Sequence, residues 1–230
     1  MQKHTLAQIP LLRSLDLEAI RRLDSMCTWK TAGPKEWLVE HDEESTDVCF
    51  LVSGTARVLI VTAADREVIL ADLQAGGFFG EFAAIDGRSR SAGIVALTKA
   101  IVAWMPATVF RDVIRSHPDV AERLLQRFTQ RLRELTRRIH EFTALQVKHR
   151  IYAELLRLSR PDPGDKRRAL VSPPPSHAEI AAYVSTRREM VARELKSLER
   201  AGLVERRRGA FVLTDVDALM ARLEAASRLR

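Results

Sequence analysis

The sequence predicts an α+β protein with a β-rich N-terminal part, a long central helix and a helical C-terminal part. Three observations support this prediction. Short apolar runs separated by glycines fill residues 30–108, apolar residues recur at helical spacing after Pro118, and a helix-start pattern begins at Ser176. A chain of 230 residues with 46% hydrophobic content can bury one sizeable core or two smaller ones.

The β-rich part is predicted to be a small barrel or jelly roll. Its short runs of Val, Ile, Phe and Trp are interrupted by glycines, among them Gly33, Gly54, Gly76, Gly77, Gly80 and Gly87. The runs Val48–Val52 and Ala56–Val61, joined at Ser53-Gly54, are typical of a β-hairpin. Many short strands within about 80 residues favour a closed β architecture, and a short helix over Asp16–Cys27 is expected before it.

A heptad pattern predicts a long helix from Pro118. Its apolar positions follow one another at alternating intervals of three and four: Leu125, Phe128, Leu132, Leu135, Ile139 and Phe142. We call these six residues the seam. Arginines surround it, so the apolar stripe is narrow, and a parallel two-stranded dimer would bury it. The alternative is that the seam packs on the protein's own β domain, because a stripe does not show which surface covers it.

The C-terminal part predicts two short helices joined by a tight turn. A helix over Val147–Ser159 precedes a proline-rich loop, and a module boundary is expected within residues 146–150. Ser176-His177-Ala178-Glu179 is a capping-box pattern, which starts a helix that runs to Val184. A second helix over Thr186–Ala201, closed by Gly202, completes a helix-turn-helix.

The stretch Leu203–Leu213 alternates like a small β-hairpin and would form a wing carrying Arg206, Arg207 and Arg208. The expected domains are thus a β jelly roll over residues 1–117, a dimerisation helix over 118–146 and a winged helix-turn-helix over 147–230.

Composition excludes several classes of protein. Two cysteines, Cys27 and Cys49, are too few for a disulfide framework or for four-cysteine zinc or iron–sulfur ligation. The sequence has no run of 18 apolar residues and no signal-peptide pattern at its start. It has no catalytic motif of the hydrolase, nucleotide-hydrolase, zinc-protease or dithiol type. We therefore expect a cytoplasmic protein that is not an enzyme and holds no metal.

Positive charge is concentrated in the second half of the chain. Residues 1–110 carry 11 basic and 14 acidic side chains, a net charge of −3, whereas residues 111–230 carry 26 basic and 16 acidic side chains, a net charge of +10. Such a surface attracts a polyanion such as nucleic acid. On charge alone, solvated arginine-rich helices explain the pattern equally well.

One segment between predicted strands, Gly80–Ala92, contains the groups that bind a phosphodiester and a ribose. A phosphodiester binds a guanidinium, a hydroxyl and free backbone amides, and a ribose binds a carboxylate. The segment supplies them through Glu81, Arg90, Ser91 and a short helical turn that begins near Gly80. On spacing alone, a surface salt bridge between Glu81 and Arg90 is the alternative.

The sequence F-G-E-F-A at 79–83, followed by R-S-A at 90–92, resembles the phosphate-binding cassette of cyclic-nucleotide-binding domains. Together with the order of the three modules, it resembles the cyclic AMP receptor, or catabolite activator, branch of the cyclic-nucleotide-responsive transcription regulators. The resemblance implies that Glu81 accepts from the ribose 2′-hydroxyl and that Arg90 pairs with the cyclic phosphate. It also implies that Ser91, with the amides of Gly80 and Ala92, completes the phosphate site.

The base end of the site differs from that branch. The resemblance places Thr136 against the purine, but Leu135 stands where the cyclic AMP activator has a second hydroxyl residue. The resemblance implies that cyclic AMP is the effector, and the departure at Leu135 leaves cyclic GMP as the alternative. The cysteine ligands of the iron–sulfur branch are missing, and a haem ligand could come only from His41 or His117.

The second predicted helix carries a candidate set of DNA contacts. Arg188, Glu189 and Arg193 span one face of that helix, where Arg can read guanine and Glu can accept from cytosine. In the activator branch this pattern reads TGTGA half-sites. Arg187, Lys196 and Arg207 are expected to contact phosphates. An Arg/Glu helix exposed only to water is the alternative.

These predictions together describe a homodimeric, cyclic-nucleotide-dependent transcription regulator that binds palindromic double-stranded DNA and contacts RNA polymerase. The competing class is a cyclic-nucleotide module that regulates another activity without binding DNA. The C-terminal helix-turn-helix pattern argues against that class.

Overall fold

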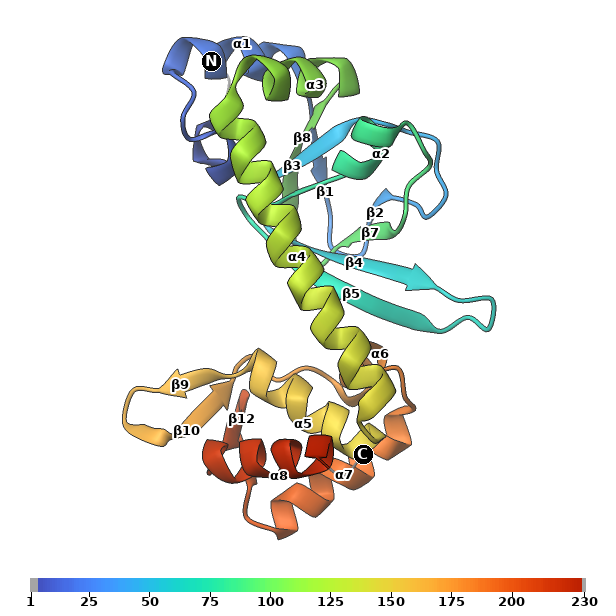
Figure 1. Ribbon diagram of the computed structural model, residues 1–230, viewed down its shortest axis with the longest axis vertical. Coiled ribbons are helices and arrows are strands. Elements are labelled where there is room, and N and C mark those ends of the chain that lie inside the picture. The colour runs from blue at the N-terminus through green and yellow to red at the C-terminus, as the bar shows by residue number, and fades with distance from the viewer. Residues whose placement is uncertain (1–3, 229–230) are drawn as a thin grey trace. The chain divides into compact units, whose positions relative to one another are not determined.

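The computed structural model describes residues 4–228, which form two compact units that divide within helix α4, between Arg131 and Leu132 (Figure 1). The first unit contains the short 3-10 turns η1 (Leu6–Gln8) and η2 (Pro10–Leu12), helices α1 (Leu17–Met26), α2 (Glu81–Asp86) and α3 (Ala107–Ser116), the start of α4 (Pro118–Ala144), and strands β1 (Thr28–Ala32), β2 (Trp37–Val39), β3 (Val48–Ser53), β4 (Thr55–Val61), β5 (Glu67–Gln74), β6 (Phe78–Phe79), β7 (Gly93–Ala96) and β8 (Ala100–Met105).

The strands of the first unit form two four-stranded antiparallel sheets, in the orders β1-β8-β3-β6 and β2-β7-β4-β5. Two facing antiparallel sheets with this crossing connectivity are a jelly roll, so the predicted fold class is confirmed. Strand β3 shows how the two layers are built. Alternate side chains point to opposite faces of a strand, so Phe50 joins the cluster beneath the helices while Cys49 and Leu51 join the cluster between the sheets.

The hairpin predicted across Ser53-Gly54 is wrong. Strand β3 pairs with β8 and β6, whereas β4 pairs with β5 and β7, so the two runs belong to different sheets. Gly54 has φ +86° and lies so close to the neighbouring chain that a Cβ would be 2.4 Å from the carbonyl oxygen of Lys99. The glycine therefore makes a corner where the chain passes from one sheet to the other, and its sequence signal is the same as that of a tight hairpin turn.

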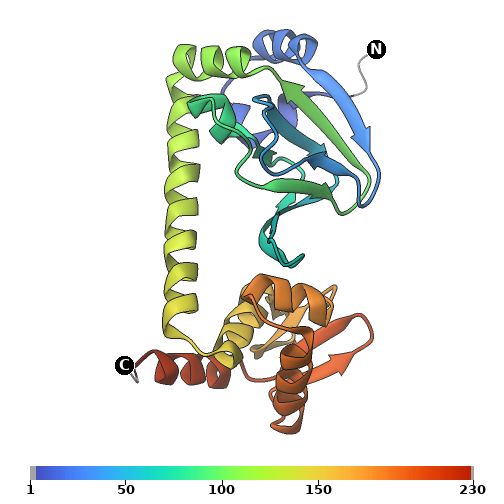
Figure 2. The same ribbon diagram turned by 90° about the vertical axis from the view of Figure 1, so that its right-hand side faces the viewer.

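Helix α4 is one unbroken helix from Pro118 to Ala144 (Figure 2). Its first turns are buried through Val120 and Leu124, which pack in the cluster beneath α1 and α3, and Phe128 packs against the same cluster. The other seam residues behave differently. Leu125, Leu132 and Ile139 are each 64% exposed, and Leu135 is 37% exposed. Packing of the seam on the protein's own β domain therefore covers Phe128 but leaves most of the other seam residues exposed.

The second unit contains the rest of α4 and helices α5 (Val147–Leu158), α6 (His177–Val184), α7 (Arg188–Arg200) and α8 (Val216–Arg228), with strands β9 (Arg160–Asp162), β10 (Asp165–Val171), β11 (Val204–Arg207) and β12 (Ala210–Leu213). The strands form one sheet in the order β11-β12-β10-β9. Its core includes Ile151, Leu155, Ile180 and Leu195, which are almost fully buried. Between residues 4 and 228, no helix is both long and apolar enough to cross a membrane.

Helices α6 and α7 form the predicted helix-turn-helix. The Ser176 hydroxyl accepts from the Glu179 amide at 3.2 Å, and the Glu179 carboxylate accepts from the Ser176 amide at 2.9 Å, which is the expected capping box. Helix α6 ends at Ser185, whose φ of +51° turns the chain toward α7. Strands β11 and β12 pair in register beyond α7 and form the predicted wing, with Gly209 in the turn.

Candidate functional site

Arg90 is the central residue of the candidate anion site. It follows α2 in the loop before β7 and is only 3% exposed. Its guanidinium donates from Nε to the Ser45 hydroxyl at 2.9 Å, from Nη1 to the Gly80 carbonyl at 3.0 Å and from Nη2 to the Asp47 carbonyl at 2.8 Å. These bonds use three of the five N–H donors of a guanidinium, so one donor on each Nη remains for a ligand.

The partners of Arg90 are all neutral oxygen atoms. Among the residues that the structure describes, no carboxylate lies within ion-pair distance of this guanidinium. The alternative explanation of the spacing, a surface salt bridge between Glu81 and Arg90, is therefore wrong. A buried cation without a paired anion is costly, and an anionic ligand removes that cost. The geometry of Arg90 thus fits a bound phosphate.

Glu81 begins α2 and directly follows Gly80, whose carbonyl accepts from Arg90. Burial raises the pKa of the Glu81 carboxyl, and the positive charges of Arg127, Arg90 and Arg131 act in the opposite direction. Arg127 and Arg131 lie one turn apart on α4, and Arg131 also donates to the Leu70 carbonyl at 3.2 Å. These guanidiniums offset part of the effect of burial and so favour the ionised carboxylate, the form that can accept from a ligand hydroxyl.

Several contributors to this site were missed by reading the sequence. Ser45 and Asp47 lie more than 40 positions before Arg90, and Arg127 and Arg131 lie on α4. The spacing of Arg127 and Arg131 by one helical turn was a usable signal, because it places both on the same face of α4. The contacts of Ser45 and Asp47 have no local signal.

The remaining predicted ligand residues are placed as follows. Gly80 caps α2 with φ +84°, Ser91 is exposed and Ala92 is half-buried beside Arg90. Leu135 and Thr136 lie on the part of α4 that belongs to the second unit, and the Thr136 hydroxyl donates to the Leu132 carbonyl at 2.9 Å. Their proposed contact with a purine stays a prediction.

The predicted DNA-contact residues share one exposed face of the second unit. Arg187 caps α7, and its first residues Arg188 and Glu189 are exposed, as are Arg193 and Lys196. Val191, Leu195 and Leu198 of the same helix are buried. The helix therefore presents a polar, mainly basic face to solvent while its apolar face holds it on the unit.

The wing adds two arginines that have acidic neighbours. Arg207 is exposed and lies 3.2 Å from a carboxylate oxygen of Glu205, which also accepts from Arg168 at 3.0 Å. Arg206 pairs with Glu199 of α7 and stacks over the Phe211 ring, 5.5 Å from its centre. These contacts fix the wing against α7.

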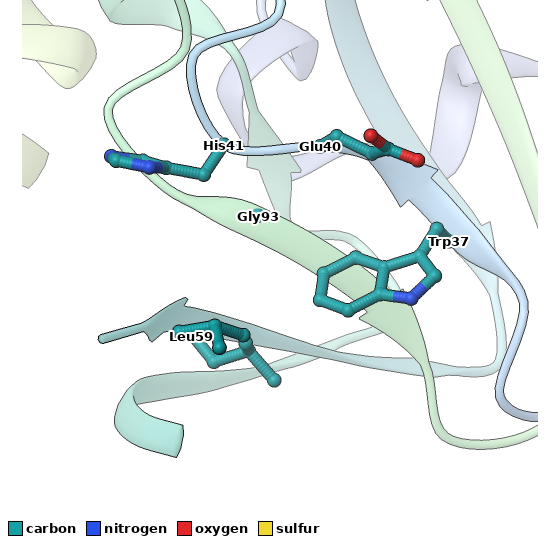
Figure 3. Close-up of a pocket in the computed structure, with 6 residues that line it drawn as sticks. Trp37, Glu40, His41, Leu59 and Gly93 are labelled. Atoms are coloured by element: carbon teal, nitrogen blue, oxygen red, sulfur yellow. The ribbon is translucent and has the colours of Figure 1, made fainter. Parts of the chain in front are cut away.

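A separate pocket of about 360 Å³ lies on the second sheet of the jelly roll, between β2, β4 and β7 (Figure 3). Trp37 forms one wall and lies over Gly93, where a Cβ would be 2.6 Å from the indole. The other residues around the pocket are Glu40, His41, Leu59 and Val61. None of these residues donates to or accepts from the Arg90 guanidinium.

No metal centre accompanies these sites within the part of the chain that the structure describes, where no three His, Cys, Asp or Glu side chains are grouped to hold an ion. His41 and His117, the two histidines considered for haem, both lie in the first unit, His41 exposed beside Asp42 and His117 at the end of α3.

Comparison with known proteins identifies two domains in this chain. The model of the cyclic nucleotide-binding domain matches residues 29–117, and the model of the Crp-like helix-turn-helix domain matches residues 149–222. The cAMP-activated global transcriptional regulator CRP of Salmonella typhimurium is 32% identical over 177 residues, which cover 74% of this chain and 81% of the relative. This relative is a transcription regulator and not an enzyme.

Two solved structures share the fold. The c-di-GMP responsive global regulator CLP of Xanthomonas campestris superposes with a TM-score of 0.71 and 24% identity, covering 86% of this chain and 99% of the other. A CooA mutant from Carboxydothermus hydrogenoformans superposes with a TM-score of 0.78 and 19% identity, covering 97% of each chain.

Proposed function

Because this chain belongs to the CRP family of cyclic-nucleotide-responsive transcription regulators, we propose that it is a homodimer whose DNA binding is controlled by cyclic AMP. The observation that carries the ligand part of this proposal is the buried guanidinium of Arg90, which has no carboxylate partner among the described residues. The cAMP-activated relative adds support for the effector.

The ligand contacts that we propose combine the geometry of Arg90 with the roles that the family resemblance implies. The two remaining Nη donors of Arg90 bind the cyclic phosphate, with Ser91 and the amides of Gly80 and Ala92 around it. Glu81 accepts from the ribose 2′-hydroxyl, and Arg127 and Arg131 favour its ionised form. Thr136 contacts the purine. Because Leu135 cannot form a hydrogen bond, cyclic GMP or another small effector is the second candidate, and one structural neighbour is c-di-GMP responsive.

The proposed dimer forms through the exposed seam residues of α4. Leu125, Leu132, Leu135 and Ile139 lie on one stripe of that helix, which a second copy of α4 would cover. The two-fold axis then presents two α7 helices to successive major grooves, roughly 34 Å apart, so the site is a palindrome. The resemblance to the activator branch implies TGTGA-like half-sites.

In each half-site, Arg188, Glu189 and Arg193 read bases, while Arg187, Lys196 and Arg207 contact phosphates. RNA polymerase is the expected protein partner of the complex on DNA. We propose that residues 1–117 bind the nucleotide, residues 118–146 form the dimerisation helix and residues 147–230 bind DNA.

Calorimetric titration with cyclic AMP and with cyclic GMP tests the ligand proposal. The parent protein should bind cyclic AMP, and Arg90→Leu should weaken binding at least about thirtyfold, because it removes a charge-assisted contact to a desolvated phosphate. Thr136→Ala should reduce affinity less and change the ratio of affinities for the two purines. If Arg90→Leu bound cyclic nucleotides like the parent, the phosphate site would be refuted, and an unchanged ratio would remove Thr136 from the site.

A further inference from the structure

His177 lies between two elements of the proposed DNA-binding face. It is the first residue of α6, and its Nε2 lies 3.2 Å from Nη2 of Arg206 on strand β11 of the wing. The positive charge of Arg188, at the start of α7, also acts on the imidazole. One titratable side chain is therefore close to the wing and to the recognition helix together.

The hydrogen bond to Arg206 requires a neutral imidazole. A guanidinium can only donate, so Nε2 of His177 must accept through its lone pair, which leaves the ring proton on Nδ1. Protonation of Nε2 removes this acceptor and places two positive charges side by side. Arg206 keeps its Nε contact with Glu199, but its Nη2 then has to find another acceptor.

The charged groups around the imidazole oppose protonation when no DNA is bound. Burial lowers the pKa of His177 from its ordinary value of 6.5, Arg206 of the wing and Arg188 of α7 lower it further, and Glu199 of α7 acts in the opposite direction. DNA phosphates in front of this face would reverse the balance, because an anion stabilises both the imidazolium and the released guanidinium.

We propose that His177 is a proton-dependent contact to the DNA backbone, and that DNA binding is coupled to uptake of a proton at its Nε2. The imidazolium and Nη2 of Arg206 then both donate to phosphate oxygens, in place of their hydrogen bond with each other. The inference rests on the proposed DNA-binding function and adds a regulation of it by pH.

The direction of the pH effect follows from linkage. In the free protein the pKa of His177 is lowered by burial and by Arg206 and Arg188, whereas DNA phosphates would raise it in the complex. Between these two values the complex holds more protons than the free protein, so affinity for DNA rises as the pH falls. Below the pKa of the free protein both states are protonated and the gain stops.

Fluorescence anisotropy with the full chain, saturating cyclic AMP and a palindromic TGTGA duplex at pH 8.0 and 6.0 tests the proposal. The parent should bind about threefold more tightly at pH 6.0, because the imidazolium adds one contact to a phosphate. His177→Gln should lose this pH dependence and bind weakly at both values. His177→Arg should bind tightly at both. His41→Gln, which changes an exposed histidine of the jelly roll, should keep the dependence of the parent.

Each other outcome has a defined meaning. If His177→Gln and the parent showed the same ratio of affinities between the two pH values, His177 would not be the proton-linked group. A parent with no pH dependence would also overturn the inference while leaving DNA binding intact. If the parent bound no DNA at either pH, the proposed function itself would fail, and this inference with it.

Discussion

The Arg90 guanidinium reaches the Gly80 carbonyl oxygen, 3.0 Å from Nη1, only because residue 80 has no side chain. A Cβ at Gly80 would lie 2.2 Å from Nη1 of Arg90 and 2.7 Å from the Asp47 carbonyl oxygen. Real Cβ atoms do not approach other atoms so closely, so the guanidinium would have to move. The position of the buried cation therefore depends on a glycine ten residues earlier, which is also the N-cap of α2.

Gly80→Ala should weaken cyclic AMP binding about tenfold or more, because it displaces Arg90 and strains the positive φ of this residue. Gly87→Ala is the matched control at the other end of α2. Gly87 also has positive φ, but a Cβ there meets nothing within 4 Å. Calorimetric titration should show near-parent affinity for Gly87→Ala. Equal losses in the two variants would show that backbone strain, and not displacement of Arg90, determines affinity.

Leu132→Asp should dissociate the proposed dimer. The change would place a charge in each half of a dry interface, at a cost of several kcal/mol per dimer. Sedimentation at micromolar protein measures the result. Arg133→Asp introduces the same side chain at the adjacent exposed position outside the seam and should leave the dimer intact. A monomeric parent, or a Leu132→Asp variant that stays dimeric, would refute the seam as the dimer interface.

Arg188→Ala and Arg207→Ala should affect DNA binding in different ways. Loss of Arg188 should cost about 1 to 3 kcal/mol on a matched site and reduce discrimination at one guanine. Loss of Arg207 should weaken binding to all sequences alike and lower the salt slope by about one unit. Glu205 keeps its contact with Arg168 in the second variant, so the wing should remain folded. Anisotropy on matched and mismatched duplexes separates these two effects, and identical profiles would contradict the assignment.

The Cys27 thiol should make the jelly roll less stable at high pH. Burial raises the pKa of Cys27 to about 12, and Asp24 and Asp47 add to the shift, whereas the unfolded thiol ionises near 9.0. Between these values only the unfolded state loses the proton, so the free energy of unfolding falls as pH rises. The slope is at most about 1.4 kcal/mol per pH unit and is reduced by the partial exposure of this thiol.

Urea unfolding at pH 8, 9 and 10 measures this effect in the parent and in Cys27→Ala. Cys27→Ala should lose less stability over this range than the parent does. Parallel losses in the two proteins would show that other groups cause the alkaline instability.

The sequence predicted those features that have a local signal. The capping box at Ser176 and Glu179, the long helix from Pro118 and the glycine-rich segment around Gly80 each lie within a few residues of the groups they position. The order of the β-rich part, the long helix and the helix-turn-helix along the chain also predicted the fold class. Elements that are set by neighbouring residues can be read from one chain, because their hydrogen bonds close within a turn or a cap.

The sequence did not predict which strands and side chains that are far apart in the chain contact one another. The turn at Gly54 was interpreted as a hairpin, but its strands join different sheets, and a glycine with positive φ serves either geometry. Ser45 and Asp47 approach Arg90 only after the jelly roll has closed. A single sequence gives no periodicity or spacing that reports such contacts.

Control of DNA binding by the nucleotide is the central claim, and fluorescence anisotropy on a palindromic TGTGA duplex with and without cyclic AMP tests it most directly. A ligand shifts DNA affinity only through unequal affinity for the two states of the dimer, and such coupling is commonly about 1 to 3 kcal/mol. We therefore predict that cyclic AMP tightens binding about 5- to 150-fold in the parent and has no effect on Arg90→Leu. Equal affinity of the parent with and without cyclic AMP would contradict the account.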